Sequence, residues 1–163
     1  MKKTLALLIA LLSVFSSCQR KLPSAADLIF EVLGALDDVP AYAIYYSDAP
    51  KYSGSTLSPE DAELLYRDCD MCSYAESFAV ALGKDDSVWE IHVFIALSAG
   101  DAGFIEDALT RRLEMLRDDD IYVYDAETYE SRIESAKVVR EGRLVCLTVC
   151  GDNALAAKKI LGK

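Results

Sequence analysis

The run from 88 to 97, with the sequence VWEIHVFIAL, is the most apolar and β-branched stretch outside the first residues of the chain. Such a run is typical of a strand in the interior of a sheet. At a period of two, one face carries only apolar side chains: Trp89, Ile91, Val93, Ile95 and Leu97. The other face is mixed, with Glu90, His92, Phe94 and Ala96. We expect the domain to assemble on this strand.

Two hairpins and a further strand are predicted around it. The run 73–82 alternates large and small side chains, and the turn 83–87 has hairpin length. The small face of that run predicts a helix packed closely over it. A second hairpin is predicted from 137–140 and 143–150, turning at Glu141-Gly142. The tyrosine-rich segment 42–46 predicts a short strand.

Helix starts alternate with these strands. Ser24 with Asp27 has the pattern of a capped helix start, and Ser58-Pro59 has another. We expect Asp101 and Asp125 to cap later helices, and Gly151-Asp152 to precede the last one. The order lacks the regular strand–helix–strand rhythm of a doubly wound sheet. It predicts an α+β fold, with a mixed or mainly antiparallel sheet of four to five strands packed by helices, in one domain over 24–163.

The first 18 residues, MKKTLALLIALLSVFSSC, have the layout of a secretory signal. Two lysines precede an apolar part that is too short to remain as a membrane-spanning helix. Ser16-Ser17-Cys18 resembles the end of a bacterial lipobox, in which the cysteine is acylated, although Phe15 stands where that pattern prefers Leu, Val or Ile. The alternative is an ordinary secretory peptide with an incidental cysteine.

A lipoprotein signal divides the chain into a signal peptide (1–17), lipidated Cys18 with a short tether (18–23), and the domain. Acylation with palmitate-type chains supplies a stable membrane anchor, because two chains hold where one is marginal. The expected location is the outward face of the cell membrane. The formal net charge of -10 makes nucleic acid an unexpected partner.

From about Ala25 onward the chain resembles the small Gram-positive bacterial lipoproteins that carry the domain of unknown function 4358. The residues that suggest this are Leu64-Leu65-Tyr66, Tyr74, Glu90 to Phe94, Asp101, Ala108 to Glu114, Tyr129, Gly142, Leu144 to Val149 and Gly151 to Ala154. The resemblance implies a compact extracytoplasmic domain on a lipid anchor. It implies no activity, because the family has none assigned.

Four cysteines of the domain have the number needed for a zinc site: Cys69, Cys72, Cys146 and Cys150. Cys146 and Cys150 are four residues apart on a predicted strand, so their Cα atoms would be about 13 Å apart. That separation is too long for one zinc ion or a direct disulfide. We therefore expect neither metal nor cofactor, and we interpret Cys146 as a small hydrophobic residue of a central strand. Cys69 and Cys72 remain a loop disulfide, two thiols, or a redox pair.

The other polar candidates each have a structural interpretation. His92, the only histidine, is expected to be a surface or half-buried strand residue beside Glu90. Three arginines of one helix could present a receptor for carboxylate or phosphate, but they are expected to pair with acids of the same helix: Arg111, Arg112 and Arg117. The aspartates after it, Asp118 to Asp120 with Asp125, lack a calcium-loop pattern. Four tyrosines are strand and edge residues rather than a platform for sugars: Tyr42, Tyr45, Tyr46 and Tyr52.

No nucleophile–base pair, phosphate loop or metal set is recognisable. We therefore predict a non-enzymatic binding or interaction module at the cell envelope, whose partner is an envelope protein or a cell-wall component. The alternative is an envelope enzyme that uses a Cys69/Cys72 thiol pair or a His92/Glu90 acid–base pair. A solute-binding receptor is disfavoured, because such receptors usually have two lobes.

Overall fold

A computed structural model of the chain describes residues 23–47, 65–66, 71–84, 88–118 and 126–163. Five strands form one sheet in the order β1-β2-β3-β5-β4, and every neighbouring pair is antiparallel. Their bounds are β1 (Tyr42–Tyr46), β2 (Ala75–Gly83), β3 (Glu90–Ala96), β4 (Lys137–Glu141) and β5 (Leu144–Val149). The predicted α+β fold and both predicted hairpins are confirmed.

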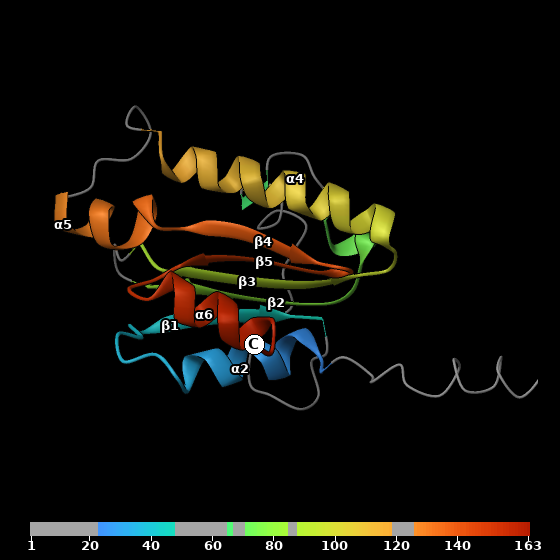
Figure 1. Cartoon of the computed structure of the whole chain (residues 1–163), viewed down its shortest axis with the longest axis horizontal. Helices are drawn as coiled ribbons and strands as arrows, with labels where there is room; N and C mark the ends of the chain where they lie inside the picture. Colours follow the sequence, from blue (N-terminus) through green and yellow to red (C-terminus); the bar gives the residue numbers. More distant parts are fainter. Residues whose placement is uncertain (1–22, 48–64, 67–70, 85–87, 119–125) are drawn as a thin grey trace, which may run out of the picture.

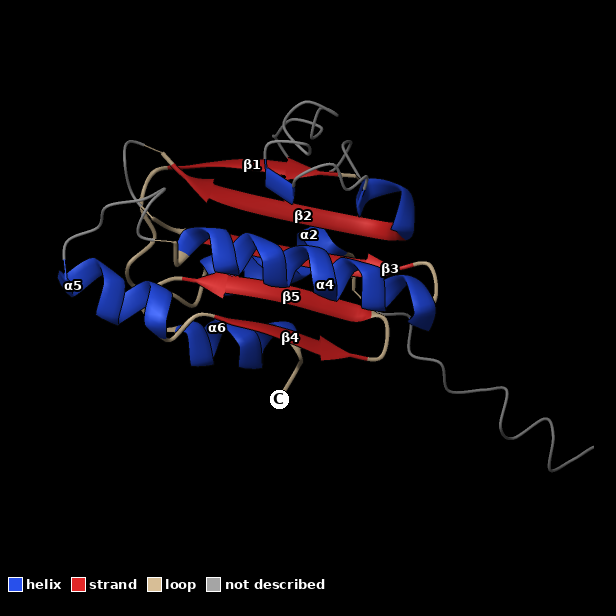
Figure 2. Ribbon diagram, turned by 90° about the horizontal axis from the view of Figure 1, so that it is seen from above, coloured by secondary structure: helices blue, strands red, loops and turns tan. Residues whose placement is uncertain are grey.

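Helices cover the two faces of this sheet. The longer ones are α2 (Ala25–Leu33), α4 (Ala99–Leu116) and α6 (Asn153–Ile160). Shorter turns are the 3-10 helix η1 (Met71–Tyr74), α5 (Ala126–Thr128) and the π-helix η2 (Tyr129–Glu134). Figure 1 shows α2 and α6 on one face and α4 on the other. Seen from above in Figure 2, α4 lies over the middle of the sheet.

β3 is the central strand, and all seven of its residues are buried. Its fully apolar face packs under α2 and α6, as the alternation predicts. The mixed face is buried as well, because α4 covers it and Phe94 packs with Ile105 and Leu109 in the second half of the core. The polar side chains Glu90 and His92 therefore lie inside the protein, which decides how the candidate site must be interpreted.

α2 begins as predicted. The Ser24 hydroxyl accepts a hydrogen bond from the Asp27 amide at 3.1 Å and donates one to the Asp27 carboxylate at 2.8 Å. The helix lies against the small-residue face of β2, where the Ala25 amide donates to the Ser77 hydroxyl at 2.9 Å. Small side chains permit this close approach, so the predicted packing is confirmed.

The start of α4 differs from the prediction. Ser98, and not Asp101, is the N-cap, and its hydroxyl accepts from the Asp101 amide at 3.1 Å. Asp101 stands three residues into the helix, where its carboxylate accepts from the Ser98 hydroxyl at 2.5 Å. β3 has already ended at Ala96, so Leu97 leaves the alternation and is 55% exposed. The expectation that Leu97 belongs to the core is therefore wrong.

Several predictions fall outside the described residues. These are the signal peptide, Cys18 and its tether, the helix start at Ser58, Tyr52, Cys69, and the aspartates 119, 120 and 125. Within the described ranges, no helix is long and apolar enough to cross a membrane.

Candidate functional site

Glu90 and His92 lie side by side on the face of β3 that α4 covers. The His92 side chain is fully buried and that of Glu90 is 10% exposed, with His92 Nε2 2.9 Å from Glu90 Oε2. The prediction of a surface or half-buried histidine is wrong. Periodicity alone cannot show that a helix covers the second face of a strand.

Arg112 reaches the same carboxylate from α4. Its Nε donates to Glu90 Oε2 at 3.1 Å, and a terminal nitrogen donates to Glu90 Oε1. The two bonds form the paired geometry that guanidinium and carboxylate groups favour. The expected pairing of Arg112 with an acid of its own helix is wrong, because Arg112 stands on the buried stripe of α4 and faces the sheet.

Tyr66 completes the cluster on the other side of the imidazole. Its hydroxyl lies 2.7 Å from His92 Nδ1, and its ring meets the His92 ring edge to face, with the centroids 5.7 Å apart. When His92 carries its proton on Nε2, both ring nitrogens have a hydrogen-bond partner. The Tyr66 hydroxyl then donates to Nδ1, and Nε2–H donates to Glu90. We call Tyr66, His92, Glu90 and Arg112 the buried polar chain.

Two pKa values in the buried polar chain depart strongly from their ordinary values. Burial raises the pKa of the Glu90 carboxyl, but the hydrogen bond from His92 and the charge and hydrogen bonds of Arg112 outweigh it, so the pKa falls to about 2. Burial, together with the negative charge of Glu90, raises the pKa of Tyr66 well above its ordinary value. Glu90 therefore stays ionised and Tyr66 stays neutral across the physiological range.

The order hydroxyl–imidazole–carboxylate is also that of hydrolytic triads. An activated nucleophile needs a lowered pKa or an adjacent base with access to substrate. Tyr66 instead has a raised pKa and is 1% exposed. The arrangement is suited to holding protons and charges in fixed positions inside the core.

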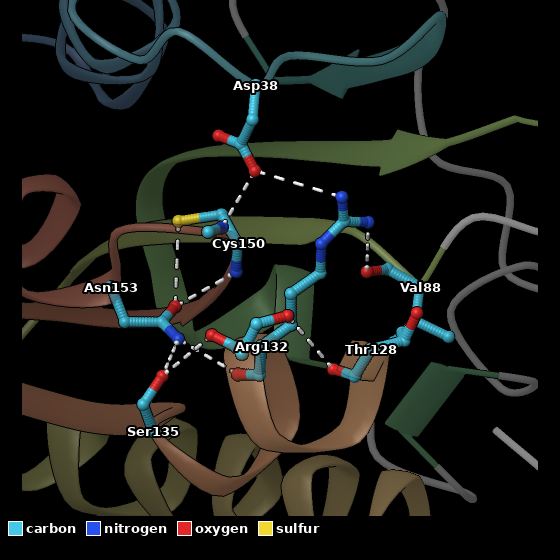
Figure 3. A network of polar contacts seen from close by, with 9 residues as sticks. Asp38, Val88, Thr128, Arg132, Ser135, Cys150 and Asn153 are labelled. Atoms are coloured by element: carbon cyan, nitrogen blue, oxygen red, sulfur yellow. Dashed lines mark hydrogen bonds and ion pairs between the residues drawn. The ribbon is translucent and has the colours of Figure 1, made fainter. Parts of the chain in front are cut away.

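A second polar network centres on Asn153, at the first position of α6 (Figure 3). Its side-chain amide donates to the Arg132 carbonyl at 2.9 Å and to the Ser135 hydroxyl at 2.8 Å. Its side-chain oxygen accepts from the Cys150 amide at 3.0 Å. Asn153 thus ties the π-helix η2 to the end of β5.

Asp38 joins this network from the segment after α2. Its Oδ2 accepts from the Gly151 amide at 2.9 Å and lies 3.9 Å from an Arg132 nitrogen. Arg132 also donates to the Val88 carbonyl at 3.2 Å. A Cβ at position 151 would lie 2.4 Å from Asp38 Oδ2, so any larger residue there would displace the Asp38 carboxylate. The network fastens four segments of the chain together at this end of the sheet.

The thiols of Cys146 and Cys150 are poor candidates for chemistry. Cys146 and Cys150 are buried, and burial raises the pKa of each to about 12. Cys146 packs among apolar side chains as predicted. Cys72 is partly buried in η1, while the pairing of Cys69 lies outside the described part of the chain. Among the described residues, no group of three or more histidine, cysteine or acidic side chains could hold a metal ion.

The remaining arginine and tyrosine candidates are also explained by packing. One Arg117 nitrogen donates to backbone carbonyls of η2 and the residues after it, the closest being Ala136 at 3.1 Å. The expectation that Arg117 pairs with acids of α4 is therefore wrong, because these hydrogen bonds are to backbone carbonyls of another segment. Tyr46 is fully buried and belongs to the core rather than to a surface platform.

Sequence reasoning missed Tyr66, Arg112 and Asn153 as parts of polar networks. Tyr66 appeared only within the family resemblance, and Arg112 lay in an apparently solvated charge pattern. The position of Arg112 on the apolar stripe of its helix, four residues after Ala108, was the one available signal.

No protein-family model, curated protein or solved structure matches this chain. The resemblance to lipoproteins with the domain of unknown function 4358 therefore stays a prediction, and any functional conclusion depends on the residues themselves.

Proposed function

We propose that this chain is an outward-facing lipoprotein, anchored to the cell membrane through acylated Cys18, whose domain is a non-enzymatic binding or interaction module of the envelope. The lipobox-like end of the leader supports the anchor. The buried polar chain supports the module. The single observation that carries this second part is that His92 and Glu90 are enclosed and already bonded to protein groups.

A general acid or base has to come within hydrogen-bond distance of its substrate. Both nitrogens of His92 are occupied, by Tyr66 on one side and Glu90 on the other. Both oxygens of Glu90 accept from Arg112. A substrate would have to displace one of these partners inside the core, leaving a charged group unpaired. The groups are suited to fixing α4 on the sheet.

The expected partner is an envelope protein or a cell-wall component. A domain with an excess of carboxylates repels nucleic acid and is drawn to neutral or basic surfaces. A tether of only a few residues after Cys18 restricts the domain to partners close to the bilayer.

One observation favours the enzyme alternative. Tyr66, His92 and Glu90 form a continuous hydrogen-bonded path along which a proton can move. An enzyme built on this path would lose turnover when His92 is replaced, even where the fold is retained. A binding module with the same replacement would still bind its partner.

The test combines three variants in cells that lack the native protein: Cys18→Ala, His92→Gln, and Cys69→Ser with Cys72→Ser. We expect Cys18→Ala alone to lose labelling by an alkyne fatty acid, because only Cys18 is acylated. Crosslinking in cells should capture the same partner with His92→Gln and the double cysteine variant as with wild type. Retained label at Cys18→Ala contradicts the anchor. A folded His92→Gln protein that binds normally but fails to restore growth or envelope properties contradicts the module.

A further inference from the structure

Leu97 and Phe104 stand out on the described surface as exposed large hydrophobic residues, at 55% and 57%. Both lie beside Tyr74, at the same end of the sheet. The Leu97 amide donates to the Tyr74 carbonyl at 2.9 Å, and the rings of Tyr74 and Phe104 lie 5.4 Å apart between centroids. We call Tyr74, Leu97 and Phe104 the apolar tip. Apolar side chains gathered in this way commonly mark an interaction surface.

The apolar tip lies at the end of the sheet where α2 begins. η1, the end of β3 and the start of α4 meet there, and Figures 1 and 2 show the same end from two sides. The Ala25 amide at the start of α2 donates to the hydroxyl of Ser77 on β2, three residues after Tyr74. The first described residues and the apolar tip therefore share one end of the domain.

Covalent geometry limits how far this end can be from the lipid. Ala25 follows Cys18 by seven positions, and a fully extended chain spans at most about 3.6 Å per residue, or about 25 Å in total. α4 alone has 18 residues and is about 27 Å long at 1.5 Å per residue. The tether therefore reaches no further than about the length of one helix, and it attaches at the end of the domain that carries the apolar tip.

Three glutamates at the end with the apolar tip are paired with cations: Glu76 with Arg143 at 2.6 Å, Glu106 with Arg140 at 3.1 Å, and Glu141 with Lys163 at 2.5 Å. This pairing reduces the repulsion between these carboxylates and an anionic headgroup layer.

We propose that the apolar tip enters the headgroup layer of the bilayer that holds the lipid of Cys18, as a second contact that orients the domain. The inference rests on the proposed lipid anchor. Leu97 and Phe104 would lie at the boundary between headgroups and acyl chains, where side chains of this kind are stabilised. The opposite end, with the Asn153 network, would then face outward, toward partners in the envelope.

The test uses the full lipoprotein, extracted from membranes and reconstituted into vesicles of phosphatidylcholine and phosphatidylglycerol with brominated acyl chains. Trp89 is the only tryptophan of the chain and is fully buried, so the wild-type protein supplies the background emission. The probe is Phe104→Trp at the apolar tip. The matched control is Glu127→Trp, an exposed helical position at the opposite end. Flotation of the vesicles measures anchoring separately.

We expect all three proteins to float with the vesicles. The probe should lose about half or more of its added emission to the bromines, since it would lie within the outer acyl region, while the control keeps its emission. Flotation with equal quenching at both positions, or with none at the probe, overturns the inference and leaves the anchor in place. A crosslinked dimer through Leu97, with an unquenched probe, assigns the patch to a second copy instead. Failure to float overturns the anchor and the inference together.

Discussion

Replacing Glu90 by glutamine removes the charge at the centre of the buried polar chain while keeping nearly the same shape. Arg112 would then be a cation, 9% exposed, whose carboxylate partner is gone. Breaking a buried ion pair by removing one partner costs about 3–5 kcal/mol. Since a domain of this size has a free energy of unfolding of about 5–15 kcal/mol, Glu90→Gln should remove a large share of its stability.

The pH dependence gives an independent magnitude. Folding lowers the pKa of Glu90 from 4.5 to about 2. A group with a lowered pKa stabilises the fold above its unfolded value, and this stabilisation is lost as the pH falls from about 4.5 towards 2. At about 1.4 kcal/mol per pKa unit the shift corresponds to about 3 kcal/mol. The difference between wild type and Glu90→Gln should therefore be largest at neutral pH and should narrow below pH 4.5.

Urea unfolding followed by the emission of Trp89 measures this difference, because Trp89 is buried in the folded state. The matched control is Glu76→Gln, which also breaks a glutamate–arginine pair, but one whose side chains are 55% and 40% exposed. Exposed pairs contribute about 0–1 kcal/mol, so the control should change stability little. Equal effects of the two substitutions, or a difference that does not narrow in acid, would refute a stabilising role of the buried polar chain.

Three further predictions follow from the same contacts. Tyr66→Phe removes the hydroxyl that donates to His92 Nδ1, and should lower the free energy of unfolding by about 1–3 kcal/mol because a buried acceptor loses its partner. Gly151→Ala displaces the Asp38 carboxylate from the Gly151 amide and should lower stability by about 0.5–1.5 kcal/mol, the net contribution of the lost hydrogen bond, measured by thermal unfolding. Cys146 should resist iodoacetamide in the folded protein and react in urea, because the thiol is buried and its pKa is raised to about 12; mass spectrometry counts the added groups.

Each of these has a control. Gly100→Ala, where the nearest atom is 3.6 Å away, should be tolerated, and an equal loss of stability at both glycines would contradict the clash. If Tyr66→Phe unfolds with the same free energy as wild type, the hydrogen bond between Tyr66 and His92 contributes nothing to stability. Rapid alkylation of Cys146 without denaturant would show that the strand opens locally.

Local patterns were sufficient to predict the elements of this fold. The alternation in β2 and β3, with a turn of hairpin length between them, predicted their antiparallel pairing, and the sheet contains it. The small-residue face of β2 predicted the close helix, which is α2. These features depend on residues near one another in sequence, where side-chain period and turn chemistry are informative.

Contacts between distant segments could not be predicted in the same way. Arg112 meets Glu90 across 22 positions, and Tyr66 meets His92 across 26. The sequence around Arg112 is compatible with pairing to an acid of the same helix. Only the placement of α4 over β3 shows that Arg112 pairs with Glu90 instead. The prediction that Leu97 belongs to the core was wrong for a related reason. β3 ends at Ala96, one residue before the alternating pattern ends, and the Leu97 side chain is exposed.

The most direct test of the proposed function is the mass of the mature N-terminus, taken from protein extracted from the membrane fraction. Trypsin cuts after Arg20, so an acylated chain would release its lipid on the three-residue peptide Cys18-Gln19-Arg20. We predict this peptide with a diacylglyceryl group on the cysteine and no peptide from residues 1–17. An unmodified cysteine, a mature chain that begins elsewhere, or recovery of the protein only in the culture medium would contradict the lipid anchor.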